Sequence, residues 1–147
     1  MFRYLNNKLD WFCITTWKKS AYNTLWCLIG CSIGDFGTII FFQITSISIP
    51  VIYIMILAII NGLITSILLE TLILIKQMSI KNAFITALNM SFISMIGMEI
   101  SMNLVDFIIT GTAEINLVVL PVMLSVGFLT PWPYNYWRLK KFNISCH

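Results

Sequence analysis

Charged residues are scarce in this sequence, which has nine Lys and Arg and six Asp and Glu among 147 residues, or 10%. A soluble domain carries about 25% charged residues. The hydrophobic fraction is 59% and the mean hydropathy is +0.88. A chain of this length cannot bury so much apolar surface in its own core. These values exclude an ordinary soluble domain and predict a membrane protein whose partner is the lipid bilayer. The net charge of +3 gives no reason to expect nucleic-acid binding.

Histidine is also nearly absent, since His147 is the only one. The sequence has no Ser/His/Asp set, no HExxH motif and no glycine-rich phosphate loop. A lone histidine cannot complete a catalytic triad. We therefore expect that the protein is not an enzyme.

Long apolar runs are abundant, and a membrane-spanning helix needs about 20 mostly apolar residues. The runs predict an all-α membrane protein, a bundle of four transmembrane helices in a single domain covering residues 1–147. Pro131 and Pro133 are expected to break or kink the last helix near its end. The predicted helices cover about 22–43, 50–75, 82–110 and 115–130.

The nine basic residues predict the orientation of these helices. With four crossings, all nine fall on one side of the membrane, as do all five tryptophans. The positive-inside rule then places both termini in the cytoplasm. We expect a multi-pass protein of the bacterial inner (cell) membrane. Residues 1–19 are predicted to form a short interfacial helix, with a frayed basic tail as the alternative, and residues 131–147 a cytoplasmic tail.

Four acidic residues fall inside the predicted helices: Asp35, Glu70, Glu99 and Asp106. Charge at the bilayer centre costs a few kcal/mol, so such residues usually face the bundle interior. No basic residue lies inside a predicted helix, so none of the four acids has an evident ion-pair partner. Each is either protonated, because desolvation disfavours the carboxylate, or neutralised by a bound cation.

The helical periodicity groups these acids with sulfur and amide side chains. One face of the third helix carries Met95, Met98, Glu99, Met102 and Asp106, with Asn103 at its border. One stripe of the first helix carries Cys27, Cys31, Asp35 and Thr38. The second helix carries Ser66 and Glu70. If the three stripes face one another, they form a ladder of polar side chains across the membrane.

Thiolates and thioethers favour soft cations such as Cu(I), whereas carboxylates suit harder cations or protons. The ladder therefore predicts sites for a transition-metal ion such as copper. The candidate ligands are Cys27, Cys31, Asp35, Glu70, Met98, Glu99 and Met102, and Cys146 and His147 form a second candidate pair. Asn103 and Asp106 are interpreted as proton or packing sites.

Packing is the competing interpretation for several of these residues. Methionine and cysteine often serve as buried apolar side chains without binding anything. Gly30 and Gly34 form a pair of small residues four positions apart, which usually marks close helix packing.

Three segments also resemble a known family. The stretch CLIGCSIGD contains a C-x3-C-x2-G-[DE] motif, residues 127–147 contain the tail GFLTPWPYNYWRLKK and end in Cys-His, and an ME-x3-N-x2-D pattern begins at Met98. Together they resemble a family of small microbial membrane proteins that is catalogued only as a domain of unknown function. The resemblance implies a helical membrane fold and assigns no activity.

The leading hypothesis is transport or handling of a cation, most simply a transition metal. Because four short crossings make a thin pathway, a homo-oligomer, most simply a homodimer, is expected. The first alternative is a non-transporting assembly or regulatory subunit of a membrane complex. The second is a proton-coupled carrier of small molecules.

Overall fold

The computed structural model describes residues 11–76 and 78–141, apart from the side chain of Met90. All regular secondary structure in this part of the chain is helical, which confirms the predicted all-α class. The five helices are α1 (Ile14–Thr45), α2 (Val51–Leu74), α3 (Ile80–Thr110), α4 (Leu120–Leu129) and α5 (Trp132–Lys141).

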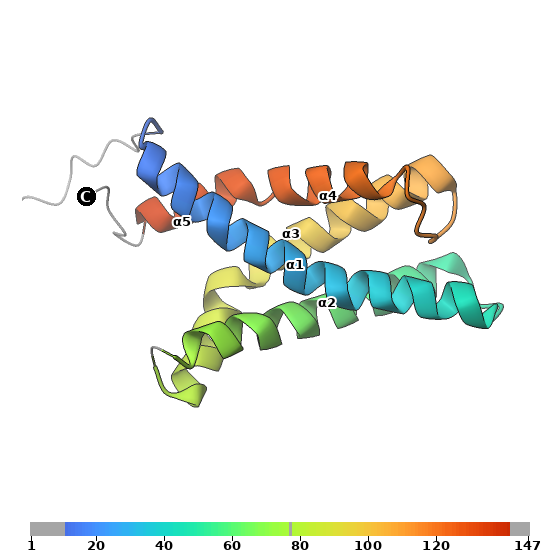
Figure 1. Ribbon diagram of the computed structural model, residues 1–147, viewed down its shortest axis with the longest axis horizontal. Coiled ribbons are helices and arrows are strands. Elements are labelled where there is room, and N and C mark those ends of the chain that lie inside the picture. Colours follow the sequence, from blue (N-terminus) through green and yellow to red (C-terminus); the bar gives the residue numbers. More distant parts are fainter. Residues whose placement is uncertain (1–10, 77, 142–147) are drawn as a thin grey trace, which may run out of the picture.

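The helices run back and forth along one long axis, so their connections gather at two ends. Figure 1 shows the start of α1, the α2–α3 connection and α5 at one end of the molecule, and the α1–α2 and α3–α4 connections at the other. We call the first end the basic end, because every Lys and Arg of the described residues belongs to its segments.

Three helices are long and apolar enough to cross a membrane, namely α1, α2 and residues Ser91–Thr110 of α3. Their outward faces expose large apolar side chains, such as Ile33, Leu68 and Ile108, which are 61%, 54% and 70% exposed. Apolar surface on this scale is unfavourable in water and favourable in lipid. These features indicate a membrane protein.

Small residues let α1 and α2 pack closely. A Cβ added to Gly30 would lie 2.7 Å from the Cα of Ser66, and one added to Gly34 would overlap the backbone of Asn61. The close approach allows Thr65 Oγ1 to donate a hydrogen bond to the Gly30 carbonyl at 2.7 Å. The packing interpretation of the Gly30–Gly34 pair therefore describes what these glycines do.

The helix α5 corrects the prediction that residues 131–147 form a tail. Residues 132–141 are helical and pack against the first turns of α1. Asn135 Nδ2 donates to Thr24 Oγ1 at 2.7 Å, and the rings of Trp17 and Tyr136 stack at 4.2 Å. A segment with so many partners on α1 is part of the bundle. Residues 142–147 lie outside the described residues.

The same packing corrects the start of the first helix. The sequence predicts an interfacial helix over 1–19 and a separate spanning helix from 22. Over the described residues, one continuous helix begins at Ile14. The Trp132 Nε1–H donates to Ser20 Oγ at 3.1 Å, so this first part of α1 is held by α5. Residues 1–10 lie outside the described residues.

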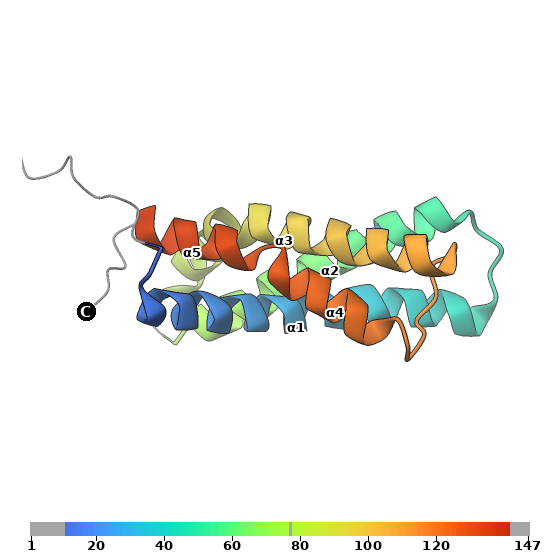
Figure 2. The same ribbon diagram turned by 90° about the horizontal axis from the view of Figure 1, so that it is seen from above.

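The fourth helix is shorter than predicted. It begins at Leu120 instead of residue 115, with Pro121 in its first turn, where proline is well tolerated. It ends at Leu129 and α5 begins at Trp132, so Pro131 lies between them, and Figure 2 shows the chain changing direction between these two helices. The preceding helix α3 ends at Thr110, and the next residue, Gly111, has a φ of 72°, the left-handed conformation typical of the position after a helix.

Candidate functional site

Five sulfur-containing side chains meet in the core between α1 and α3. They form a hydrophobic core cluster together with Leu28, and we call the five the sulfur cluster: Cys27, Cys31, Met95, Met98 and Met102. Cys27 is 2% exposed and the other four are fully buried. Both cysteines are free thiols. The predicted faces of the first and third helices therefore do meet, as the ladder requires.

Two glycines on neighbouring helices make room for the third-helix face. A Cβ added to Gly62 of α2 would overlap the carboxyl group of Glu99. A Cβ added to Gly127 of α4 would lie 2.6 Å from the sulfur of Met102. The bundle thus closes tightly around Glu99 and Met102 because these two positions carry no side chain.

Glu99 is fully buried beside the sulfur cluster. Neither of its carboxyl oxygens has a hydrogen-bond partner in the described part of the chain. Cys27, Cys31 and Asp35 all interact with it electrostatically. An unpartnered buried carboxyl group is costly, so its presence calls for a ligand, a proton or a compensating role.

Asp35 and Asn103 extend this group along the bundle axis. Asn103 Nδ2 donates to Asp35 Oδ1 at 3.2 Å and to the Glu99 carbonyl at 3.1 Å. Asp35 Oδ2 and Asn103 Oδ1 have no partner among the described residues. Glu99, Asn103 and Asp35 therefore form a partly satisfied polar group next to the thiols and thioethers.

Asp106 lies one turn beyond Asn103 on α3, and it is 1% exposed. The Thr110 hydroxyl lies 2.7 Å from its carbonyl and 3.4 Å from its Oδ1. One hydrogen-bond partner is Thr110 at the end of α3, and Asp106 also interacts electrostatically with Asp35 and Glu114.

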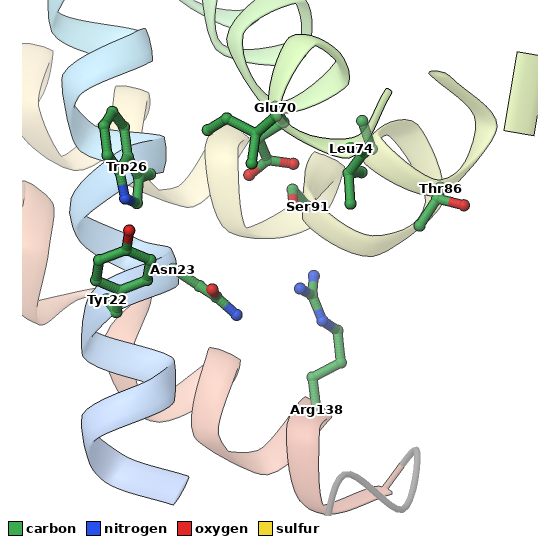
Figure 3. A pocket seen from close by; sticks show the side chains of 10 residues that line it. Tyr22, Asn23, Trp26, Glu70, Leu74, Thr86, Ser91 and Arg138 are labelled. Atoms are coloured by element: carbon green, nitrogen blue, oxygen red, sulfur yellow. The ribbon is translucent and has the colours of Figure 1, made fainter. Parts of the chain in front are cut away.

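Glu70 does not join the sulfur cluster. It lines a separate pocket at the basic end, together with Arg138 of α5 (Figure 3). The two side chains interact electrostatically. The premise that no basic residue lies inside a helix is therefore wrong, because residues 132–141 fold into α5 and bring Arg138 into the bundle.

The structure brings some of the predicted metal ligands together and leaves others apart. Cys27, Cys31, Met98, Met102, Glu99 and Asp35 gather in one region, Glu70 lies elsewhere, and Cys146 and His147 lie outside the described residues. Within residues 11–76 and 78–141, no three His, Cys, Asp or Glu side chains form a metal-binding group. A metal in the sulfur cluster would therefore need methionine ligands as well as the two thiols.

The family comparison agrees with this whole-bundle architecture. Residues 16–143 match the family described as a domain of unknown function (DUF4396). The chain belongs to this family. The match runs from the first turn of α1 to just past α5, so all five helices lie essentially within the family domain. No curated protein and no solved structure matches the chain.

Sequence reasoning missed Arg138 and Ser91 as residues of a site. One signal was present for the helix that carries Arg138. After Pro131, Trp132, Tyr136 and Leu139 recur at helical spacing, which predicts an apolar face able to pack on another helix. Pro133 near the start of that segment is compatible with a new helix beginning there. Ser91 carried no signal, because one serine in an apolar helix is uninformative.

Proposed function

We propose that this protein binds a soft transition-metal ion, most simply Cu(I), in the sulfur cluster and moves it across the membrane. The observation that carries the proposal is the meeting of two free thiols and three thioethers in one buried cluster. Thiol and thioether sulfurs are the ligands that Cu(I) prefers. The protein then acts in transport or handling of the ion and not as an enzyme.

The acids beside the cluster support a pathway more than a static site. Glu99 lies next to Cys31, and Asp35 and Asn103 continue toward the end opposite the basic end. A thiol loses its proton when it binds the metal, because a thiolate is the ligand form, and the ionised carboxylate of Glu99 accepts that proton. Asp35 offers the next oxygen along the route.

The proposed topology keeps four crossings with both termini on the cytoplasmic side of a bacterial inner membrane. The basic end supports this orientation, because positively charged segments stay in the cytoplasm. At about 1.5 Å per residue, the 10 residues of α4 extend only about 15 Å, roughly half of the hydrocarbon core. The fourth crossing therefore combines the apolar turn before α4, α4 itself and the first turn of α5.

The sulfur cluster lies inside one chain, so binding of the ion does not need a second copy. A homodimer remains our proposal for the transporting form. Native mass spectrometry of the detergent-solubilised protein tests it directly.

Metal binding by the purified protein is the decisive test. Cu(I) is titrated in competition with a chromogenic Cu(I) chelator, and Zn²⁺, Ni²⁺ and Co²⁺ are titrated separately. Wild type is expected to bind Cu(I) selectively, and the double variant Cys27→Ser/Cys31→Ser is expected to lose that binding. Affinity no tighter than roughly 1 mM, about −4 kcal/mol, would reject the metal proposal.

A flux assay in proteoliposomes separates transport from storage. A Cu(I)-sensitive dye inside the vesicles reports entry of the ion. Wild type is expected to show flux, and Glu99→Gln is expected to retain binding with reduced flux. Binding without flux would favour metal handling by an assembly subunit. Flux of another solute that needs Glu99 and tolerates loss of both cysteines would favour a proton-coupled carrier.

A further inference from the structure

A second site lies at the basic end, in the pocket that contains Glu70 and Arg138. The pocket has a volume of about 160 Å³ and is bounded by α1, α2, α3 and α5. Figure 3 shows the carboxylate of Glu70 and the guanidinium of Arg138 approaching the same space from opposite sides, with Ser91 beside Glu70. We call it the charged pocket.

The side chains of Glu70 and Arg138 both face the pocket but do not form an ion pair with each other. No ion pair within 4.0 Å joins Glu70 to Arg138, although both lie in the described part of the chain. Arg138 is 7% exposed, and its Nε has no hydrogen-bond partner among the described residues. A buried guanidinium with a free donor is costly unless a ligand uses it.

The remaining walls of the pocket carry the aromatic side chains that are typical of lipid-headgroup depth. Tyr22 and Trp26 of α1 line it, with their rings 6.1 Å apart. Tyr and Trp concentrate at the boundary between hydrocarbon and headgroups. Ile73 and Leu74 supply apolar walls, and both Tyr22 and Ile73 are exposed, so the pocket reaches the outer surface of the bundle.

We propose that the charged pocket binds a small zwitterionic group that carries a phosphate and a primary ammonium. Arg138 binds the phosphate, because its planar fork of N–H donors matches phosphate oxygens. Glu70 accepts hydrogen bonds from the ammonium, and Ile73 and Leu74 contact the carbon chain. The group is either the headgroup of phosphatidylethanolamine or a free solute of the same chemistry, such as phosphoethanolamine.

The site is independent of the sulfur cluster, so its test does not depend on metal binding. Full-length protein in detergent is mixed with phosphatidylethanolamine, phosphatidylcholine or phosphatidylglycerol, and bound lipid is measured by native mass spectrometry. Phosphatidylethanolamine is expected to bind about tenfold more tightly than the other two. Only its headgroup combines a phosphate for Arg138 with ammonium N–H donors for Glu70.

Variants separate the two halves of the site. Glu70→Gln is expected to abolish the preference for phosphatidylethanolamine over phosphatidylglycerol, and Arg138→Gln to weaken binding of all three lipids. Arg138→Lys keeps the positive charge and is expected to bind with intermediate affinity. Lys140→Gln and Glu114→Gln make the same charge changes outside the pocket and are expected to bind like wild type.

Competition identifies the source of the group. If phosphoethanolamine displaces the lipid, the headgroup is sufficient for binding without acyl chains, and a free solute can be the ligand. Binding of the intact lipid without such displacement assigns the site to the membrane. Equal binding of all three lipids by wild type, with no binding of phosphoethanolamine, would overturn the proposal and leave Glu70 and Arg138 as internal opposite charges. Because that outcome is measured on wild type, it does not depend on whether a variant folds.

Discussion

The sulfur cluster and the charged pocket solve the burial of polar groups in opposite ways. In the sulfur cluster the side chains are closed off from solvent, and Glu99 has no basic partner and no hydrogen bond to its carboxyl oxygens among the described residues. In the charged pocket Glu70 is only partly buried, and an opposite charge, Arg138, faces it. The sulfur cluster is tightly packed and its acid has no opposite charge beside it, whereas the charged pocket is open and holds one acidic and one basic side chain.

This difference indicates which region depends on packing and which on charge. The shape of the sulfur cluster is set by glycines on α2 and α4 that no larger residue can replace without movement. The charged pocket is set by one long side chain that α5 brings into the bundle. Substitutions that add volume should therefore damage the first region, and substitutions that remove charge should alter the second.

The largest expected effect follows from filling the space beside Glu99. Gly62→Ala is expected to lower the free energy of unfolding by about 2–3 kcal/mol, because the new methyl group overlaps the carboxyl group of Glu99. Thermal unfolding in detergent measures the change. Gly97→Ala is the matched control, since no atom lies within 4 Å of its added Cβ. Equal behaviour of the two variants would show that α2 and α3 are not packed as described.

The next effect concerns the uncompensated carboxyl group itself. Glu99→Gln is expected to raise the free energy of unfolding by about 1–2 kcal/mol at neutral pH, because an amide avoids the cost of either burying the carboxylate or protonating it. Glu114→Gln, on an exposed loop, is expected to leave stability unchanged. Denaturant titration of both variants makes the comparison. A clear loss of stability in Glu99→Gln would mean that the carboxylate has a stabilising partner.

Replacing one thioether tests whether the cluster binds metal or only packs. Met98→Leu nearly conserves volume, so stability should change by less than about 1.5 kcal/mol. Cu(I) affinity should nevertheless fall about tenfold, or roughly 1.4 kcal/mol, because a sulfur ligand is lost. Met123→Leu is the control, since Met123 is fully buried on α4 but lies outside the sulfur cluster. Equal Cu(I) affinities for both variants would favour packing alone.

The smallest effect on stability is expected in the charged pocket. Glu70→Gln should change the free energy of unfolding by less than about 1 kcal/mol, because Glu70 is partly exposed and no ion pair within 4.0 Å joins it to Arg138. Thermal unfolding without added lipid measures this value. A loss of several kcal/mol would show that Glu70 holds α5 in place, and the pocket would then be a structural contact.

Much of the fold was predictable because apolar periodicity is a local property. The spans of α2 and α3 lie within two residues of their predicted bounds at each end, and Pro131 marks a real break. The shared face of Met95, Met98, Glu99 and Met102 was also predictable, since residues three and four apart lie on one side of a helix.

The parts that could not be predicted depend on contacts between distant segments. The segment 132–141 looked like a tail because it is polar, and its helix is stabilised by Trp17 and Thr24, more than a hundred residues earlier. Glu70 was grouped with Glu99 because both are acids in the membrane. In the structure Glu70 instead lines a pocket with Arg138, a residue of α5 that is distant in the sequence.

By itself, the sequence determined that the chain is helical, that it belongs in lipid, and which side chains share a helix face. These properties follow from hydropathy and from the 3.6-residue period, which act over one or two turns. Only the tertiary structure decided that the thiols of α1 meet the thioethers of α3, and that Arg138 faces Glu70. Such pairings depend on how closely helices approach, and at Gly30 and Gly34 a side chain would collide with the backbone of α2.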